Sequence, residues 1–110
     1  MPNEFNDFIE EMLQDWYPIH IKRMFGSFGV FRDGRMFAII DDDMLYFKAN
    51  ENTKHIFENI NCPQFTYMKK DNKKTNLNYF KAPDECYDST DVMEYYANIA
   101  WQAAEKNKDI

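Results

Sequence analysis

The chain has 110 residues, with 13 basic and 19 acidic side chains, and its formal net charge is −6. This length supports one domain over residues 1–110, and a 45% apolar content is enough to bury a core, which excludes intrinsic disorder as the default state. No apolar run approaches the ~20 residues that a membrane-spanning helix needs, and the acidic first eleven residues lack the basic start of a signal peptide, so we expect a cytoplasmic protein.

An amphipathic helix is predicted over residues 4–16. Six apolar side chains recur at helical spacing and form one stripe, while the acidic side chains take the other side. Asn3 is placed to cap the first turn, and Pro18 ends the helix because it forces Tyr17 out of the α region. The stripe consists of Phe5, Phe8, Ile9, Met12, Leu13 and Trp16.

Short runs rich in Ile, Phe, Val, Met and Tyr replace the helical pattern between residues 19 and 48, and they indicate about four strands. The Asp33-Gly34 pair favours a two-residue type I′ turn, which would pair residues 30–32 with residues 36–40. A second turn at the three aspartates 41–43 then returns the chain along residues 44–48.

A short helix is expected after the fourth strand, with Asn50 or Asn52 as its N-cap. Its inner face would hold Ile56, Phe57 and Ile60. Residues 65–70 and 75–81 then form a second hairpin around a polar tip.

A brief helical turn over residues 83–85 leads to the last helix, which begins at Asp88 or Ser89. Its apolar face is predicted to consist of Val92, Tyr96, Ile99, Ala100, Ala103 and Ala104. The lysines near its end suit the negative end of the helix dipole.

The element order is therefore α-β-β-β-β-α-β-β-α, with tight hairpins and no room for βαβ crossovers between the early strands. This order predicts an α+β fold of two layers, in which an antiparallel sheet of about six strands carries helices on one face. Three helices with single apolar stripes cannot easily cover both faces, so we expect the other face to be partly open to solvent or to a partner.

No arrangement of reactive side chains points to an enzyme. Gly26 and Gly29 lack the spacing of a phosphate-binding loop and indicate tight bends or bulges. The side chains that could act as nucleophile, base or metal ligand stand singly in the sequence. These single residues are Ser27, His20, His55, Cys62 and Cys86. We therefore expect a non-enzymatic protein without cofactor or metal, whose cysteines are buried thiols.

Charge is divided along the chain. Residues 1–16 hold five acids and no base, and residues 82–110 hold seven acids and two bases, which solvated helix surfaces explain. The basic and aromatic cluster at the second hairpin consists of Lys69, Lys70, Lys73 and Lys74 with Tyr67 and Tyr79. Solubilising that hairpin is the preferred explanation, and the net charge argues against direct DNA binding.

Residues 24–38 read Met-Phe-Gly-Ser-Phe-Gly-Val-Phe-Arg-Asp-Gly-Arg-Met-Phe-Ala and resemble the N-terminal domain of the TfoX/Sxy family of competence regulators. The resemblance extends over nearly the whole chain, from Phe5 to Ala104. It implies a fold like that of type III secretion chaperones and a role as a bacterial transcriptional co-regulator of natural competence that acts with the cyclic-AMP receptor protein. Full-length regulators of the family carry a second, C-terminal domain, whereas this chain ends at Ile110.

Two functional hypotheses follow. In the first, the chain is a protein-interaction module whose exposed sheet face binds a regulatory partner or a second copy of the chain. The candidate contact residues are Met24, Phe25, Phe28, Arg32, Tyr46 and Tyr79. The apolar side chains would serve as anchors, and Arg32 would form the polar rim. In the second, Lys69, Lys70, Lys73 and Lys74 make the chain a nucleic-acid-contacting accessory domain.

Overall fold

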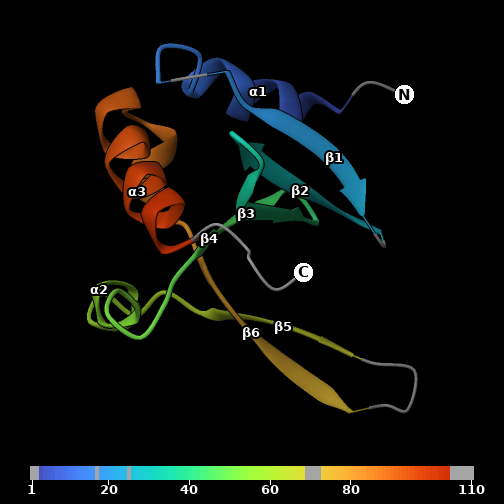
Figure 1. Ribbon diagram of the computed structural model, residues 1–110, viewed down its shortest axis with the longest axis vertical. Coiled ribbons are helices and arrows are strands. Elements are labelled where there is room, and N and C mark those ends of the chain that lie inside the picture. Colours follow the sequence, from blue (N-terminus) through green and yellow to red (C-terminus); the bar gives the residue numbers. More distant parts are fainter. Residues whose placement is uncertain (1–2, 17, 25, 69–72, 105–110) are drawn as a thin grey trace.

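Six short strands pair into one open antiparallel sheet with the order β1-β2-β3-β4-β6-β5 (Figure 1). The computed structural model describes residues 3–16, 18–24, 26–68 and 73–104. Its strands are β1 (His20–Met24), β2 (Ser27–Arg32), β3 (Arg35–Asp41), β4 (Met44–Lys48), β5 (Gln64–Met68) and β6 (Lys74–Lys81). The helices are α1 (Glu4–Met12), α2 (Lys54–Glu58), the 3₁₀ helix η1 (Asp84–Tyr87) and α3 (Thr90–Ala103). The predicted α+β class and antiparallel sheet are confirmed.

Two aspartate-containing turns set the register of β2, β3 and β4. Asp33 and Gly34 have φ values of 51° and 78°, and Asp42 and Asp43 have values of 51° and 58°, so both turns have the positive φ pair of type I′. The predicted hairpins are therefore confirmed. One bulge interrupts the β2–β3 pairing at Val30 and Phe31, and it was not predicted.

The helices pack on one face of the sheet, which we call the covered face. Alternate residues of the strands meet the apolar stripes of α1, α2 and α3 there, and together they form the main core. The fully buried side chains of this core include Ile9, Leu13, Val30, Phe37, Phe47, Phe57, Cys86 and Met93. Small alanines along α3 let this helix approach β3 and β4 closely.

Three local predictions are wrong. The first helix ends at Met12 instead of residue 16, because the chain tightens into turns that bring the Trp16 ring to 5.2 Å from the ring of Phe37. Ile60 is 47% exposed because α2 ends two residues before it. The prediction for the last helix is wrong in part. Ala100, Ala103 and Ala104 are buried as predicted, but Met93 and Ala97 take the places predicted for Val92 and Tyr96, which lie at the margin.

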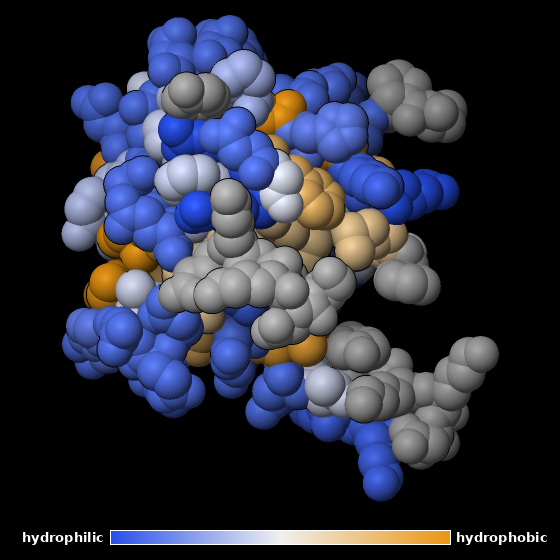
Figure 2. Space-filling view, viewed as in Figure 1, coloured by the Kyte–Doolittle hydropathy of each residue, from blue (hydrophilic) through white to orange (hydrophobic). Residues whose placement is uncertain are grey.

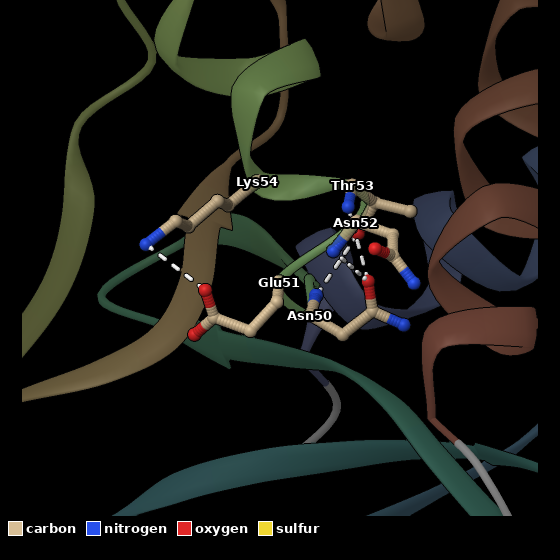
Figure 3. Close-up of polar contacts among 5 residues, drawn as sticks. All are labelled: Asn50, Glu51, Asn52, Thr53 and Lys54. Atoms are coloured by element: carbon tan, nitrogen blue, oxygen red, sulfur yellow. Dashed lines mark hydrogen bonds and ion pairs between the residues drawn. The ribbon is translucent and has the colours of Figure 1, made fainter.

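A compact turn carries the chain from β4 into α2 (Figure 3). The Asn50 side chain accepts hydrogen bonds from the backbone N–H groups of Asn52 and Thr53, and the Thr53 hydroxyl accepts one from the N–H of Asn50. Thr53 is the N-cap residue, so Asn50 organises the turn before the helix. An exposed ion pair joins Lys54 to Glu51 at 3.5 Å (Figure 3).

β4 ends at Lys48 and is shorter than β6, so much of β6 pairs with β5 alone. β4 pairs with β6 only at its last residues, over Tyr79, Phe80 and Lys81. The β5–β6 hairpin consequently extends away from the helices (Figure 1). This projecting hairpin contains the predicted second hairpin, whose tip lies outside the described residues.

The cysteines are free thiols. Cys86 is fully buried, and burial raises the pKa of its thiol to about 12, whereas Cys62 is only half-buried. No helix in the described ranges is long and apolar enough to cross a membrane.

Candidate interaction surface

The sheet face opposite the helices carries a second, smaller set of apolar side chains. We call it the open face. Strand alternation and pairing place on it Lys22, Met24, Gly29, Phe31, Met36, Ile39, Met44, Tyr46, Lys48, Phe65, Leu77, Tyr79 and Lys81. The buried residues of α1, α2 and α3 all belong to the core on the other side. The described helices therefore leave this face without a covering layer, as the sequence predicts.

Side chains of the open face bury one another in part. Ile39, Phe65 and Tyr79 are only 7–8% exposed, and they lie beneath half-buried neighbours that include Tyr46. The rings of Tyr46 and Phe65 are tilted with their centroids 4.8 Å apart. This face thus combines a small fixed cluster with an outer layer of partly exposed apolar side chains.

Tyr79 ties this cluster to the sheet. Its hydroxyl donates a long hydrogen bond of 3.5 Å to the backbone carbonyl of Met36, on a strand two positions away in the sheet. Burial raises the pKa of the phenol to about 12, because the charged form would lose its hydration in this cluster.

Gly29 makes room for two methionines on the open face. A β-carbon at this position would lie 2.7 Å from the sulfur of Met36 and 2.8 Å from that of Met24. The predicted bend or bulge at Gly29 is wrong, because the residue is regularly paired with both neighbouring strands and the bulge follows it. Gly26, with a φ of 86°, does occupy the expected turn.

Lys48 is a half-buried cation of the open face. Its ammonium lies 5.1 Å from the centroid of the Tyr79 ring, which allows a cation–π contact. Burial of the half-buried side chain lowers the pKa of Lys48. The only ion pair found among the described residues joins two others, Lys54 and Glu51.

The predicted contact residues do not all meet. Met24, Tyr46 and Tyr79 lie on the open face. Phe28 lies on the covered face, where the guanidinium of Arg23 is 5.7 Å from its ring centroid. Phe25 lies outside the described residues.

Arg32 also lies on the covered face, between two indole rings. Its guanidinium carbon is 4.1 Å from the ring centroid of Trp16 and 4.6 Å from that of Trp101. The Trp101 indole N–H donates a hydrogen bond of 2.9 Å to the backbone carbonyl of Arg32. This sandwich joins the end of the α1 region to β2 and α3, so the contacts of Arg32 within the chain are structural. A role for Phe28, Arg32 or Phe25 in binding stays a prediction.

Sequence reasoning missed several members of the open face, namely Met36, Ile39, Phe65 and Leu77. The Asp33-Gly34 turn carried a usable signal for Met36, because its register places Met36 opposite Phe31. Ile39 could not be assigned in this way, because the turn alone would place Ala38 opposite Gly29 and the bulge shifts the pairing by one residue. The bulge puts Phe37 and Ala38 on the covered face in succession and so reverses the alternation.

A hollow separates the body of the molecule from the projecting β5–β6 hairpin, and apolar residues gather along its margin (Figure 2). A shallow depression of about 510 Å³ lies next to the open face at the β1 edge. It is lined by Pro18, Ile19, His20, Lys22, Phe31, Asp33 and Gly34.

In the described parts of the chain, no three His, Cys, Asp or Glu side chains come together as metal ligands would.

The predicted nucleic-acid cluster is only partly described. Lys73 and Lys74 are exposed at the start of β6. Lys69 and Lys70 lie outside the described residues, so the structure does not place the four lysines relative to one another.

Comparison with known proteins gives a consistent result. The TfoX N-terminal domain model matches residues 11–104. The chain is 34% identical over 59 residues to the DNA transformation protein TfoX1 of Aliivibrio fischeri, an alignment that includes 54% of this chain and 28% of that protein. The chain thus aligns with less than a third of the length of that relative. The matched region includes most of the chain, with all six strands, α2, η1 and α3, so the chain belongs to the TfoX N-terminal domain family.

Proposed function

We propose that this chain is a non-enzymatic protein-interaction domain that acts in the control of natural competence, and that its open face contacts the partner. The observation that carries the proposal is the difference between the two faces of the sheet. Helices bury one face, whereas the outermost side chains of the other are only half-buried. Methionine and aromatic side chains are enriched in protein interfaces, which favours a macromolecular partner for this face.

The family supports the regulatory context. The curated relative is named a DNA transformation protein. The resemblance found in the sequence makes the cyclic-AMP receptor protein the first partner to test, with a second copy of the chain as the other. In this proposal the domain works in the cytoplasm, and Met24, Tyr46 and Tyr79 supply the apolar contacts.

The test is a transformation assay in the host bacterium, with the chromosomal copy replaced by the Met24→Ala, Tyr46→Ala double variant. We expect the transformation frequency to fall about tenfold or more, because truncating central interface side chains commonly costs more than 1 kcal/mol each. Tyr95→Ala is the matched control, since Tyr95 is 59% exposed on α3, behind the covered face. It should leave the frequency unchanged.

A binding measurement accompanies the assay. Calorimetric titration of the purified chain with the cyclic-AMP receptor protein, in the presence of cyclic AMP, should give heat with the parent chain and with Tyr95→Ala but not with the double variant. Circular dichroism checks that each variant is folded. A folded double variant that transforms as well as the parent would refute the proposed role of the open face.

Nucleic-acid contact is the second candidate, and the projecting hairpin favours it. This hairpin extends from the body and has exposed Lys73 and Lys74 at its described end (Figure 1). An electrophoretic shift assay at low salt should then detect a complex that weakens steeply as salt is added. Lys70→Glu with Lys73→Glu should abolish it, whereas Lys54→Glu on α2 should have little effect. Absence of a complex at low salt would dispose of this candidate.

A further inference from the structure

One row of paired residues crosses the open face with a lysine at each end and apolar positions between them. Lys22 pairs with Gly29, and Gly29 pairs with Ile39. Ile39 in turn pairs with Tyr46, and Tyr46 pairs with Lys81. Five strands contribute to the row, so with neighbouring strands about 4.8 Å apart its length along the sheet is about 19 Å.

Lys48 adds a third cation beside this row. It lies two residues after Tyr46 on the same face of β4, and its half-buried ammonium is held against Tyr79. No carboxylate of the described residues lies within ion-pair distance of it. A half-buried ammonium has lost part of its hydration, and an incoming carboxylate would compensate for that loss.

The rest of the molecule has the opposite charge. The chain as a whole carries −6, and acidic side chains occupy the first turns of α1 and η1. The open face itself carries one acid of β3, Asp41, at the end of the strand where it pairs with Met44. Asp41 is already engaged, because its carboxylate accepts the hydroxyl hydrogen bond of Ser27. The centre of the open face is therefore basic and apolar within an acidic protein.

The form of the ligand follows from the backbone. In the middle of the sheet the backbone groups of β2, β3 and β4 already bond to their neighbours, so an extended peptide lying on this face would find no partners for its own N–H and C=O groups. A helix satisfies its backbone internally and presents side chains only. At 1.5 Å per residue, about 13 residues of helix span the row.

A second copy of the chain fits this face less well. Two open faces stacked on each other would bring their lysines together. The apolar stripes of α1 and α3 are already used in the core of their own chain, so neither helix could offer anchors to another copy.

We infer that the open face binds an amphipathic helix of a partner protein, about 13 residues long, whose apolar stripe meets the Gly29–Ile39–Tyr46 row and whose flanking carboxylates meet Lys22, Lys48 and Lys81. This inference rests on the proposed function and adds the chemistry of the partner. Met24 and Met36, which pack over Gly29, can adjust to the apolar side chains that arrive.

A displayed library of helical 18-residue peptides tests this inference without knowledge of the natural partner. Positions of one stripe are randomised among apolar residues, and the flanking positions are randomised among Glu, Gln and Lys. The library is selected against the full chain. Because the chain is acidic overall, unspecific attraction would enrich lysine. The inference instead requires enrichment of Glu on both sides of the stripe.

Variants locate the interaction. A selected acidic helix should bind the Lys48→Glu, Lys81→Glu chain at least about tenfold more weakly, and selection against that chain should reverse the preference toward Lys. The control is Lys54→Glu with Lys74→Glu, which changes the net charge equally away from the row and should leave binding within about twofold. If Lys48→Glu does not fold, Lys48→Gln with Lys81→Gln replaces it, and the expected result is loss of the Glu preference.

Three outcomes would overturn the inference. In the first, the parent chain selects peptides with Lys or Gln beside the apolar stripe. In the second, the Lys48 and Lys81 variants bind the acidic helix as tightly as the parent does. In the third, light scattering shows that the chain is a dimer and that Tyr46→Ala abolishes the dimer. The proposed function fails separately. If Met24→Ala, Tyr46→Ala lowers transformation while no acidic helix is selected, the open face binds a partner of other chemistry. If acidic helices are selected but transformation is unaffected, the site exists and the proposed role is wrong.

Discussion

The two faces of this sheet use similar side chains for different purposes. On the covered face, Phe37, Phe47 and Phe57 are fully buried between the strands and the helices. On the open face, the inner cluster around Tyr79 is almost as well buried, but only half-buried side chains lie outside it. The stability of the domain therefore resides chiefly in the covered layer, which leaves the outer layer of the open face available for contact.

We expect the largest difference in stability between variants of two neighbouring residues of β4, Tyr46 and Phe47, whose side chains lie on opposite faces of the sheet. Phe47→Ala should lower the free energy of unfolding by about 3–5 kcal/mol, because it leaves a cavity in the main core. Tyr46→Ala, on the open face, should cost about 1 kcal/mol. Urea denaturation of both variants measures the difference. Equal losses would show that the open face contributes as much to stability as the covered one.

A smaller loss of stability is expected at high pH, when Tyr79 in the inner cluster of the open face loses its proton. The folded pKa of Tyr79 is raised to about 12, above the ordinary value of 10.0, so the folded state holds the phenolic proton more tightly than the unfolded state does. The associated stability is complete below pH 10 and is lost as the pH rises from 10 to 12. The loss should be on the order of 2 kcal/mol.

Tyr79→Phe is the matched control for this loss, since phenylalanine keeps the ring and removes the titrating group. Urea denaturation at several pH values should show the parent losing more stability than Tyr79→Phe between pH 10 and 12. If the two proteins lose the same stability between pH 10 and 12, the phenol of Tyr79 is accessible to water and the open face is more hydrated than its packing indicates.

The sequence was sufficient to predict the one-sided arrangement of helices but not the composition of the open face. Helical spacing identified the stripe of α1 and part of the buried face of α3, and Asp33-Gly34 identified the central hairpin, because these signals depend on residues close together in the chain. The bulge lies beside Phe37, whose ring packs against Trp16, and Trp16 is distant from it in sequence. For the same reason Arg32 could not be recognised as the centre of a tryptophan sandwich, and it was predicted to be an exposed rim residue.

Gly29 offers a more local test of the open face. Gly29→Val places branched carbons where the sulfurs of Met24 and Met36 lie, and it should cost about 1–2 kcal/mol in unfolding free energy. Shortening one neighbour should relieve the clash, so Met36→Ala combined with Gly29→Val should cost less than the sum of the two single changes. Chemical denaturation of the four proteins measures the coupling. Additive losses would mean that the methionines do not pack over Gly29.

The smallest predicted loss of stability concerns Arg32 on the covered face. Arg32→Lys keeps the positive charge but loses the flat guanidinium that fits between Trp16 and Trp101, so we expect a loss of about 1 kcal/mol in unfolding free energy and a change in tryptophan fluorescence. Arg35→Lys is the matched control, because its described ring contact involves Trp101 alone, and its effect should be smaller. Equal losses would mean that stacking between two rings gives no advantage over one. A variant with unchanged stability but lower transformation frequency would instead assign Arg32 to partner binding and extend the contact surface around the edge of the sheet.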